Sequence, residues 1–210
     1  MIIVVPGLAV RCYLEDAVAA VSRRGHQVWM PPAPGAPGTA CDLQRYGEEL
    51  GGTIRDRGGT ALLLGVSVGC QAAAVAATSA PVGRLVLVSP TVDPRVRSWC
   101  GLAGAWLRGT ADEPPRLGLE QLPDWRRAGA RRLVAVVRSA LRVRLEDVLP
   151  RVGASVVVVH GERDSITSHG YAAALAAAPG RQLVVVPGAT HSWPYGDGAR
   201  FADLVGKLGR

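Results

Sequence analysis

The chain contains 210 residues, of which 48% are hydrophobic and 20% are charged. This composition is typical of one globular domain and excludes a disordered chain. No apolar stretch reaches the roughly 18 residues that a membrane-spanning helix requires. Met1 is followed directly by an apolar run, without the basic start and cleavage site of a secretory signal. We therefore expect a cytoplasmic protein that does not bind membranes.

Positive charge dominates, with 24 Lys and Arg residues against 17 Asp and Glu residues and a net charge of +7, yet Lys207 is the single lysine. Such arginine enrichment together with abundant Ala and Gly is typical of a G+C-rich genome. Because no known nucleic-acid-binding motif accompanies the charge, we expect no nucleic-acid partner. The cysteines have neither CxxC nor metal-ligand spacing, which predicts free thiols, no metal and no other cofactor. They are Cys12, Cys41, Cys70 and Cys100.

Short apolar runs alternate with helical stretches along most of the chain. The predicted strands are residues 2–5, 26–30, 61–65, 84–89, 155–160 and 182–187. The clearest helical stretches are residues 14–24, 42–57, 70–79 and 171–178, and the proline-rich segment 31–39 is predicted to be a loop. The strand runs are continuous rather than alternating, as in parallel strands covered on both faces. The pattern predicts an α/β fold with about six mostly parallel strands and helices on both faces.

One region interrupts this alternation. Residues 95–148 contain no strand-like run, only helical stretches that carry three tryptophans. We expect a helical cap here, inserted after the fourth strand and lying over the carboxyl edge of the sheet. The expected domains are therefore a core of residues 1–94 and 149–210 and a cap of residues 95–148.

Residues 65–69 read Gly-Val-Ser-Val-Gly and match the G-x-S-x-G nucleophile elbow. The pattern alone is weak, because a glycine-rich turn can carry an incidental serine. Its context is more specific, since a predicted strand leads into it and a helix of small residues leads out. Ser67 is therefore a candidate nucleophile.

A serine hydroxyl needs a general base and a group that orients this base. Of the four histidines, His191 follows the last predicted strand, at the same sheet edge as Ser67. Asp164 follows the preceding strand at that edge, and the order Ser67, Asp164, His191 is one that this elbow uses. Asp93, one strand earlier, is the rival acid.

The segments GVSVG, HGERD and PGATH resemble the elbow, acid loop and histidine loop of α/β-hydrolase-fold serine hydrolases. The resemblance covers nearly the whole chain apart from the cap. It implies that Ser67 attacks, His191 transfers the proton and Asp164 orients the histidine. It also implies an oxyanion hole formed by the backbone amides of Val68 and Leu8.

Two departures from the family pattern are visible. Many relatives have His-Gly where this chain has Pro6-Gly7, which removes a side chain that often braces the oxyanion loop. The family also has two strands before the first strand predicted here, and this sequence has no room for them. We therefore expect six strands.

The expected cap holds eleven arginines against six acidic residues. This charge fits an anionic substrate or an acidic carrier protein, but we favour the interpretation of a solvated helical surface. Trp99, Trp106 and Trp125 are candidates for lining an acyl pocket, although packing of the cap onto the sheet would also explain them.

The resemblance implies a serine hydrolase that cleaves an ester or thioester of a small acyl substrate through an acyl-enzyme. Within the enzyme class, a carbon–carbon bond hydrolase or a non-hydrolytic cyclase on the same fold remains open. From another class, a catalytically silent ligand-binding homologue is the alternative, which the presence of all three candidate residues disfavours.

Overall fold

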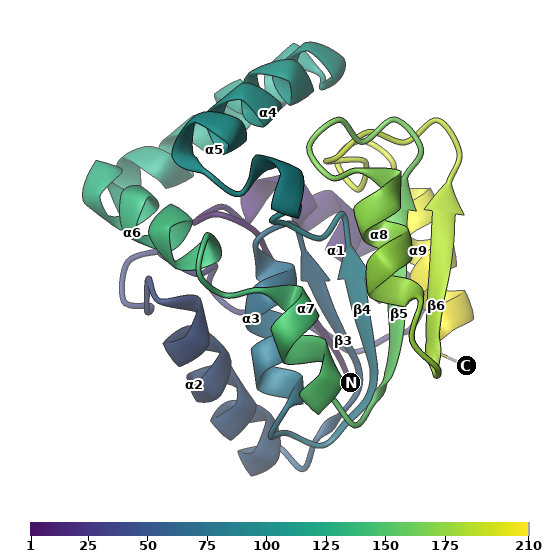
Figure 1. Ribbon diagram of the computed structural model, residues 1–210. Helices are drawn as coiled ribbons and strands as arrows, with labels where there is room; N and C mark the ends of the chain where they lie inside the picture. Colours follow the sequence, from purple (N-terminus) through teal and green to yellow (C-terminus); the bar gives the residue numbers. More distant parts are fainter. Residues whose placement is uncertain (210) are drawn as a thin grey trace.

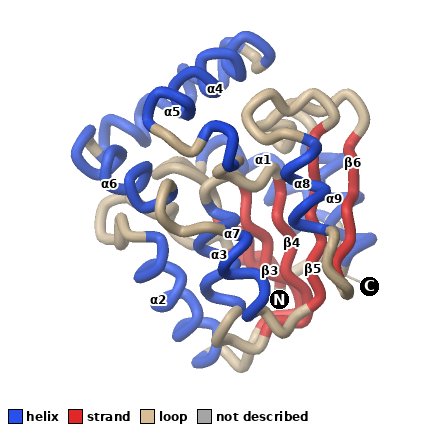
Figure 2. Tube along the Cα trace, in the orientation of Figure 1, coloured by secondary structure: helices blue, strands red, loops and turns tan. Residues whose placement is uncertain are grey.

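A computed structural model describes residues 1–209 of the chain. Its centre is one sheet of six strands in the order β2-β1-β3-β4-β5-β6, in which every pairing is parallel (Figures 1 and 2). The strands are β1 (Ile2–Val5), β2 (Val28–Trp29), β3 (Thr60–Val66), β4 (Val82–Val88), β5 (Ser155–Gly161) and β6 (Arg181–Val186). The prediction of six strands is confirmed, and the sheet is wholly rather than mostly parallel.

Helices cover both faces of this sheet. The core helices are α1 (Cys12–Arg23), α2 (Leu43–Asp56), α3 (Gly69–Ala77), α8 (His169–Ala176) and α9 (Gly198–Leu208). Side chains of β1 alternate between two buried clusters: Ile2 and Val4 face α1 and α9, whereas Ile3 and Val5 face α2 and α3. Burial on both faces explains why the strands read as continuous apolar runs. Helix α9 was not predicted, because its apolar stripe is short and interspersed with charged residues.

A helical insertion separates β4 from β5, as predicted. It comprises a short 3₁₀ helix η1 (Pro94–Val96), α4 (Trp99–Asp112), α5 (Pro115–Ala128), α6 (Ala130–Ala140), α7 (Leu145–Val148) and the 3₁₀ helix η2 (Leu149–Arg151). Helices α4, α5 and α6 lie above the carboxyl ends of the strands, whereas α7 packs beside α3 (Figure 1). No helix in the described part of the chain is long and apolar enough to cross a membrane.

The insertion is fastened to the proline-rich loop between β2 and α2. Arg132 of α6 donates hydrogen bonds to the carbonyls of Gly35, Ala36 and Thr39 in this loop. These carbonyls lie in a loop. The guanidinium supplies the donor for those of Gly35 and Thr39, and it adds to the bonds that the Ala36 carbonyl accepts from the amide and hydroxyl of Thr39. One arginine of the insertion therefore serves a structural role.

Helices α2 and α3 approach closely at Gly47, where an added Cβ would lie 2.6 Å from Cβ of Val75. We predict that Gly47→Ala destabilises the protein by about 1–3 kcal/mol through overpacking. Gly52 lies in the same helix, where the nearest atom to an added Cβ is the flexible end of Arg55 at 3.8 Å. Gly52→Ala should therefore stabilise by up to about 1 kcal/mol through helix propensity. Urea unfolding of both variants checks this, and equal effects would contradict the close packing.

Candidate active site

The turn from β3 to α3 places Ser67 in a strained backbone conformation. Its φ of 53° lies in the left-handed region, which is costly for a residue other than glycine. The flanking glycines permit the turn, because a Cβ on Gly65 would lie 2.5 Å from Cα of Cys70. A Cβ on Gly69 would lie 2.3 Å from the Val5 carbonyl oxygen. Strand and helix therefore meet closely enough to present the Ser67 side chain at the sheet edge.

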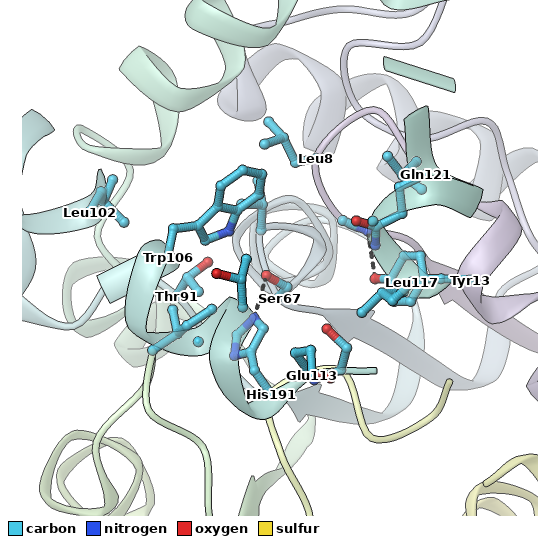
Figure 3. Close-up of a pocket in the computed structure, with 18 of the residues that line it drawn as sticks. Leu8, Tyr13, Ser67, Thr91, Leu102, Trp106, Glu113, Leu117, Gln121 and His191 are labelled. Carbon is cyan, nitrogen blue, oxygen red and sulfur yellow. Dashed lines mark hydrogen bonds between the residues drawn. The ribbon is translucent and has the colours of Figure 1, made fainter. Parts of the chain in front are cut away.

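The structure brings Ser67, His191 and Asp164 into one hydrogen-bonded chain. His191 Nε2 lies 2.9 Å from Ser67 Oγ (Figure 3). His191 Nδ1 lies 3.0 Å from each carboxylate oxygen of Asp164. The three residues come from loops after β3, β6 and β5, which end at the same edge of the parallel sheet. This arrangement has the contacts by which a histidine can accept the proton of a serine hydroxyl.

The Asp164 carboxylate is buried, yet its contacts favour the ionised form. Burial alone would raise its pKa, but the adjacent His191 and the amides of Thr167 and Ile166 lower the pKa below its ordinary value. Both amides donate to Oδ1 at 2.9 Å. The rival acid, Asp93, is bonded elsewhere, to the amide of Arg95 and to Ser168. Asp164 is thus the carboxylate that contacts the imidazole.

The same contacts determine the charge of His191. Burial would lower its pKa, but the Asp164 carboxylate, its hydrogen bond and the more distant Glu113 raise the pKa above its ordinary value of 6.5. The site therefore stabilises an imidazolium, which is the form that arises when the ring accepts a proton.

Two backbone amides near Ser67 are the candidates for an oxyanion hole. The amides of Leu8 and Val68 have no protein acceptor within residues 1–209. Val68 is the N-cap of α3, so its amide lies at the positive end of the helix dipole. Leu8 is braced from the insertion, since Trp125 Nε1 donates to its carbonyl at 3.1 Å. Sequence reasoning did not foresee this contact between the insertion and the loop after β1.

A cavity of about 540 Å³ opens next to these groups. Its wall includes Ser67 and His191 from the core and many apolar side chains from α4 and α5 (Figure 3). Trp99, Trp106 and Trp125 all line it, and the Trp106 and Trp125 ring centroids are 5.4 Å apart. The volume is ordinary for a small-molecule pocket.

Two acidic residues of the insertion bind the core near the site, and the sequence analysis did not identify them. Glu113 accepts hydrogen bonds from the Ser192 amide at 2.8 Å and from Thr190 Oγ1 at 3.1 Å, on either side of His191. Asp124 accepts from the amides of Arg11 and Cys12 at the start of α1. In each of these bonds the donor and acceptor residues lie more than 75 positions apart in the sequence. No local pattern could therefore have revealed them.

Cys12 and Cys70 do not compete with Ser67 as the nucleophile. Burial, assisted by Asp124, raises the pKa of Cys12 to about 11, and burial raises the pKa of Cys70 well above its ordinary value. Both therefore remain protonated at neutral pH, and a protonated thiol is a poor nucleophile.

The profile of the alpha/beta hydrolase family matches residues 2–204 of the chain. The chain belongs to this family. No curated protein sequence matches it significantly. The predicted fold, an α/β-hydrolase core with a helical insertion after the fourth strand, is thereby confirmed.

Solved structures share the fold of this alpha/beta hydrolase at low sequence identity. An esterase from Exiguobacterium antarcticum is 15% identical with a TM-score of 0.79, over 100% of this chain and 92% of that one. Est816, described as an N-acyl homoserine lactone degrading enzyme, is 15% identical with a TM-score of 0.78, and the match covers 98% of this chain and 92% of Est816. Esterase RhEst1 from a Rhodococcus species is 20% identical with a TM-score of 0.71, and the match covers 99% of this chain and 89% of RhEst1.

Replacing the buried carboxylate of this alpha/beta hydrolase should change the titration of His191. We predict that Asp164→Asn lowers the pKa of His191, because the neutral amide no longer offsets the effect of burial. Asp93→Asn should leave the pKa unchanged, since Asp93 makes no contact with the ring in the described structure. NMR titration of the His191 ring nitrogens measures both effects, and the opposite ranking would make Asp93 the partner acid.

Proposed function

We propose that the protein is a serine hydrolase that cleaves an ester or thioester of a small acyl substrate. The observation that carries this proposal is the 2.9 Å contact between Ser67 Oγ and His191 Nε2, beside a cavity of about 540 Å³. In this proposal the core comprises residues 1–94 and 149–210, and residues 95–148 form the cap over the substrate.

In the first half of the reaction, His191 Nε2 takes the proton from Ser67 Oγ as this oxygen attacks the acyl carbon. The carbonyl oxygen becomes an oxyanion that accepts hydrogen bonds from the amides of Leu8 and Val68. Each such donor contributes roughly 3 kcal/mol to transition-state stabilisation. Asp164 remains ionised, fixes the ring through Nδ1 and stabilises the imidazolium.

In the second half, the imidazolium gives its proton to the departing alcohol or thiol, and an acyl-Ser67 ester remains. His191 then accepts a proton from a water molecule, whose oxygen attacks the acyl carbon. Collapse of this second tetrahedral intermediate releases the carboxylic acid and returns the proton to Ser67. Two structural neighbours are named esterases and a third is described as degrading a lactone, which favours oxygen esters.

A fluorophosphonate probe tests the nucleophile directly. We predict a single covalent adduct on the folded protein, detected by intact mass, and its loss in Ser67→Ala and His191→Ala. Ser192→Ala is the matched control, because Ser192 lines the same cavity but follows the histidine instead of contacting Nε2. Folded wild-type protein that forms no adduct would favour a binding or non-hydrolytic role.

The pH dependence of kcat/KM should report the protonation of His191 in the free enzyme. Because the pKa of His191 is raised above 6.5, the ring stays protonated to higher pH than an ordinary histidine. We therefore predict that activity with a neutral ester falls on acidification, with a midpoint above pH 6.5. In Asp164→Asn this midpoint should move to lower pH, and kcat should fall by about 10³- to 10⁴-fold. A wild-type midpoint below 6.5 would contradict this assignment.

A further inference from the structure

The wall of the cavity carries almost no charge. Among the described residues that line it there is no lysine or arginine, and the acidic and basic side chains present are Glu113 and His191. The rest of the wall is largely apolar and includes Leu102, Leu117 and Trp106 (Figure 3). The cavity therefore differs sharply in charge from the insertion that covers it.

No arginine of the insertion is among the described residues that line the cavity, and most of these arginines are exposed. Arg116 and Arg127 pair with acids on their own helix, and their side chains are 85% and 71% exposed. Arg97 donates to the carbonyl of the cavity residue Val92 at 2.9 Å. Its guanidinium is paired with Glu146 at 2.5 Å. The positive charge of the insertion therefore provides no partner for an anionic substrate in the described wall of the cavity.

Glu113, by contrast, is held in the wall at the reacting end. Its two carboxylate oxygens accept hydrogen bonds from Ser192 and Thr190, the neighbours of His191 in the chain. These bonds hold the half-buried side chain against the loop that carries His191. A fixed negative charge in an apolar wall stabilises the imidazolium and repels a second negative charge more strongly than it would in water.

We propose that the cavity takes a neutral, apolar acyl group and that Glu113 is a specificity-determining residue that excludes acyl groups bearing a carboxylate. This inference rests on the proposed hydrolase function, and it narrows the substrate class. It also disfavours a carbon–carbon hydrolase that would hold the substrate carboxylate with an arginine. If the carboxylates of Glu113 and of the acyl group lay about 8 Å apart at an effective dielectric constant of about 20, their repulsion would correspond to roughly a 30-fold preference for the neutral acyl group.

The test uses two esters that differ in one charge, 4-nitrophenyl methyl adipate and 4-nitrophenyl hydrogen adipate. The wild-type enzyme should have a kcat/KM at least tenfold higher for the neutral methyl diester. Glu113→Gln, which keeps an acceptor for Ser192, should reduce this ratio at least fivefold. Glu120→Gln is the matched control, because Glu120 lies on α5 outside the cavity wall and its loss changes the net charge equally. Its ratio should remain that of the wild type.

An equal or higher kcat/KM for the anionic ester, while Ser67 still labels, would overturn the inference and leave the hydrolase function intact. A wild-type preference that survives in Glu113→Gln would overturn the role of Glu113. Should that variant fail to fold, Gln121→Lys places a cation on the same wall and should reduce the wild-type preference at least tenfold. No reduction would show that charge on this wall does not select substrates.

Binding to Ser67→Ala separates selectivity from chemistry. Trp106 and Trp125 line the cavity, so tryptophan fluorescence can follow the titration with dimethyl adipate and with monomethyl adipate. Tighter binding of the dimethyl ester would support the inference even if the wild-type protein formed no fluorophosphonate adduct. Equal binding, or tighter binding of the monoanion, would overturn it.

Discussion

The contact between the start of α3 and the end of β1 is the constraint on which the site depends. A Cβ at Gly69 would lie 2.3 Å from the carbonyl oxygen of Val5 and 2.5 Å from that of Pro6. Only a glycine allows helix and strand to approach so closely. The approach places the β1 loop, which carries Leu8, directly beside the turn that carries Ser67 and Val68. Both candidate oxyanion amides and the serine are therefore positioned by one steric condition.

The residues at the strand ends were predictable because parallel topology is simple. Carboxyl ends of parallel strands share one edge of a sheet, so a serine, an aspartate and a histidine after three of them must lie near one another. Strand continuity and the elbow glycines identified these ends from local sequence alone. Asp93 and Asp164 each follow a strand at that edge, and Asp164 was preferred because its loop resembles the family's acid loop. In the structure Asp164 is the carboxylate that contacts the ring.

The contacts of the insertion were not predictable for a different physical reason. Helical periodicity shows which face of a helix is apolar, but it does not show where the helix lies over the sheet. The bond from Trp125 to the Leu8 carbonyl joins residues 117 positions apart, and that from Ser192 to Glu113 joins residues 79 apart. The arginine count likewise left open whether the insertion attracts anions or is a solvated surface. In the structure these side chains are bonded to carbonyls and acids or exposed outside the cavity. Composition gives the number of charged residues but not where their side chains lie.

Through Asp124, the insertion supplies the hydrogen-bond acceptor at the N-terminus of α1, a helix of the core. Arg11, the N-cap of α1, forms no side-chain capping bond of its own. Asp124 Oδ2 accepts instead from the amides of Arg11 and Cys12, at 3.2 and 3.4 Å, and a lost cap costs about 1 kcal/mol. An engineer who transplants a foreign lid onto this scaffold must therefore supply an acceptor at the same point, or install a capping serine or aspartate at position 11. Otherwise the exchange would weaken α1, a helix of the core that lies outside the lid.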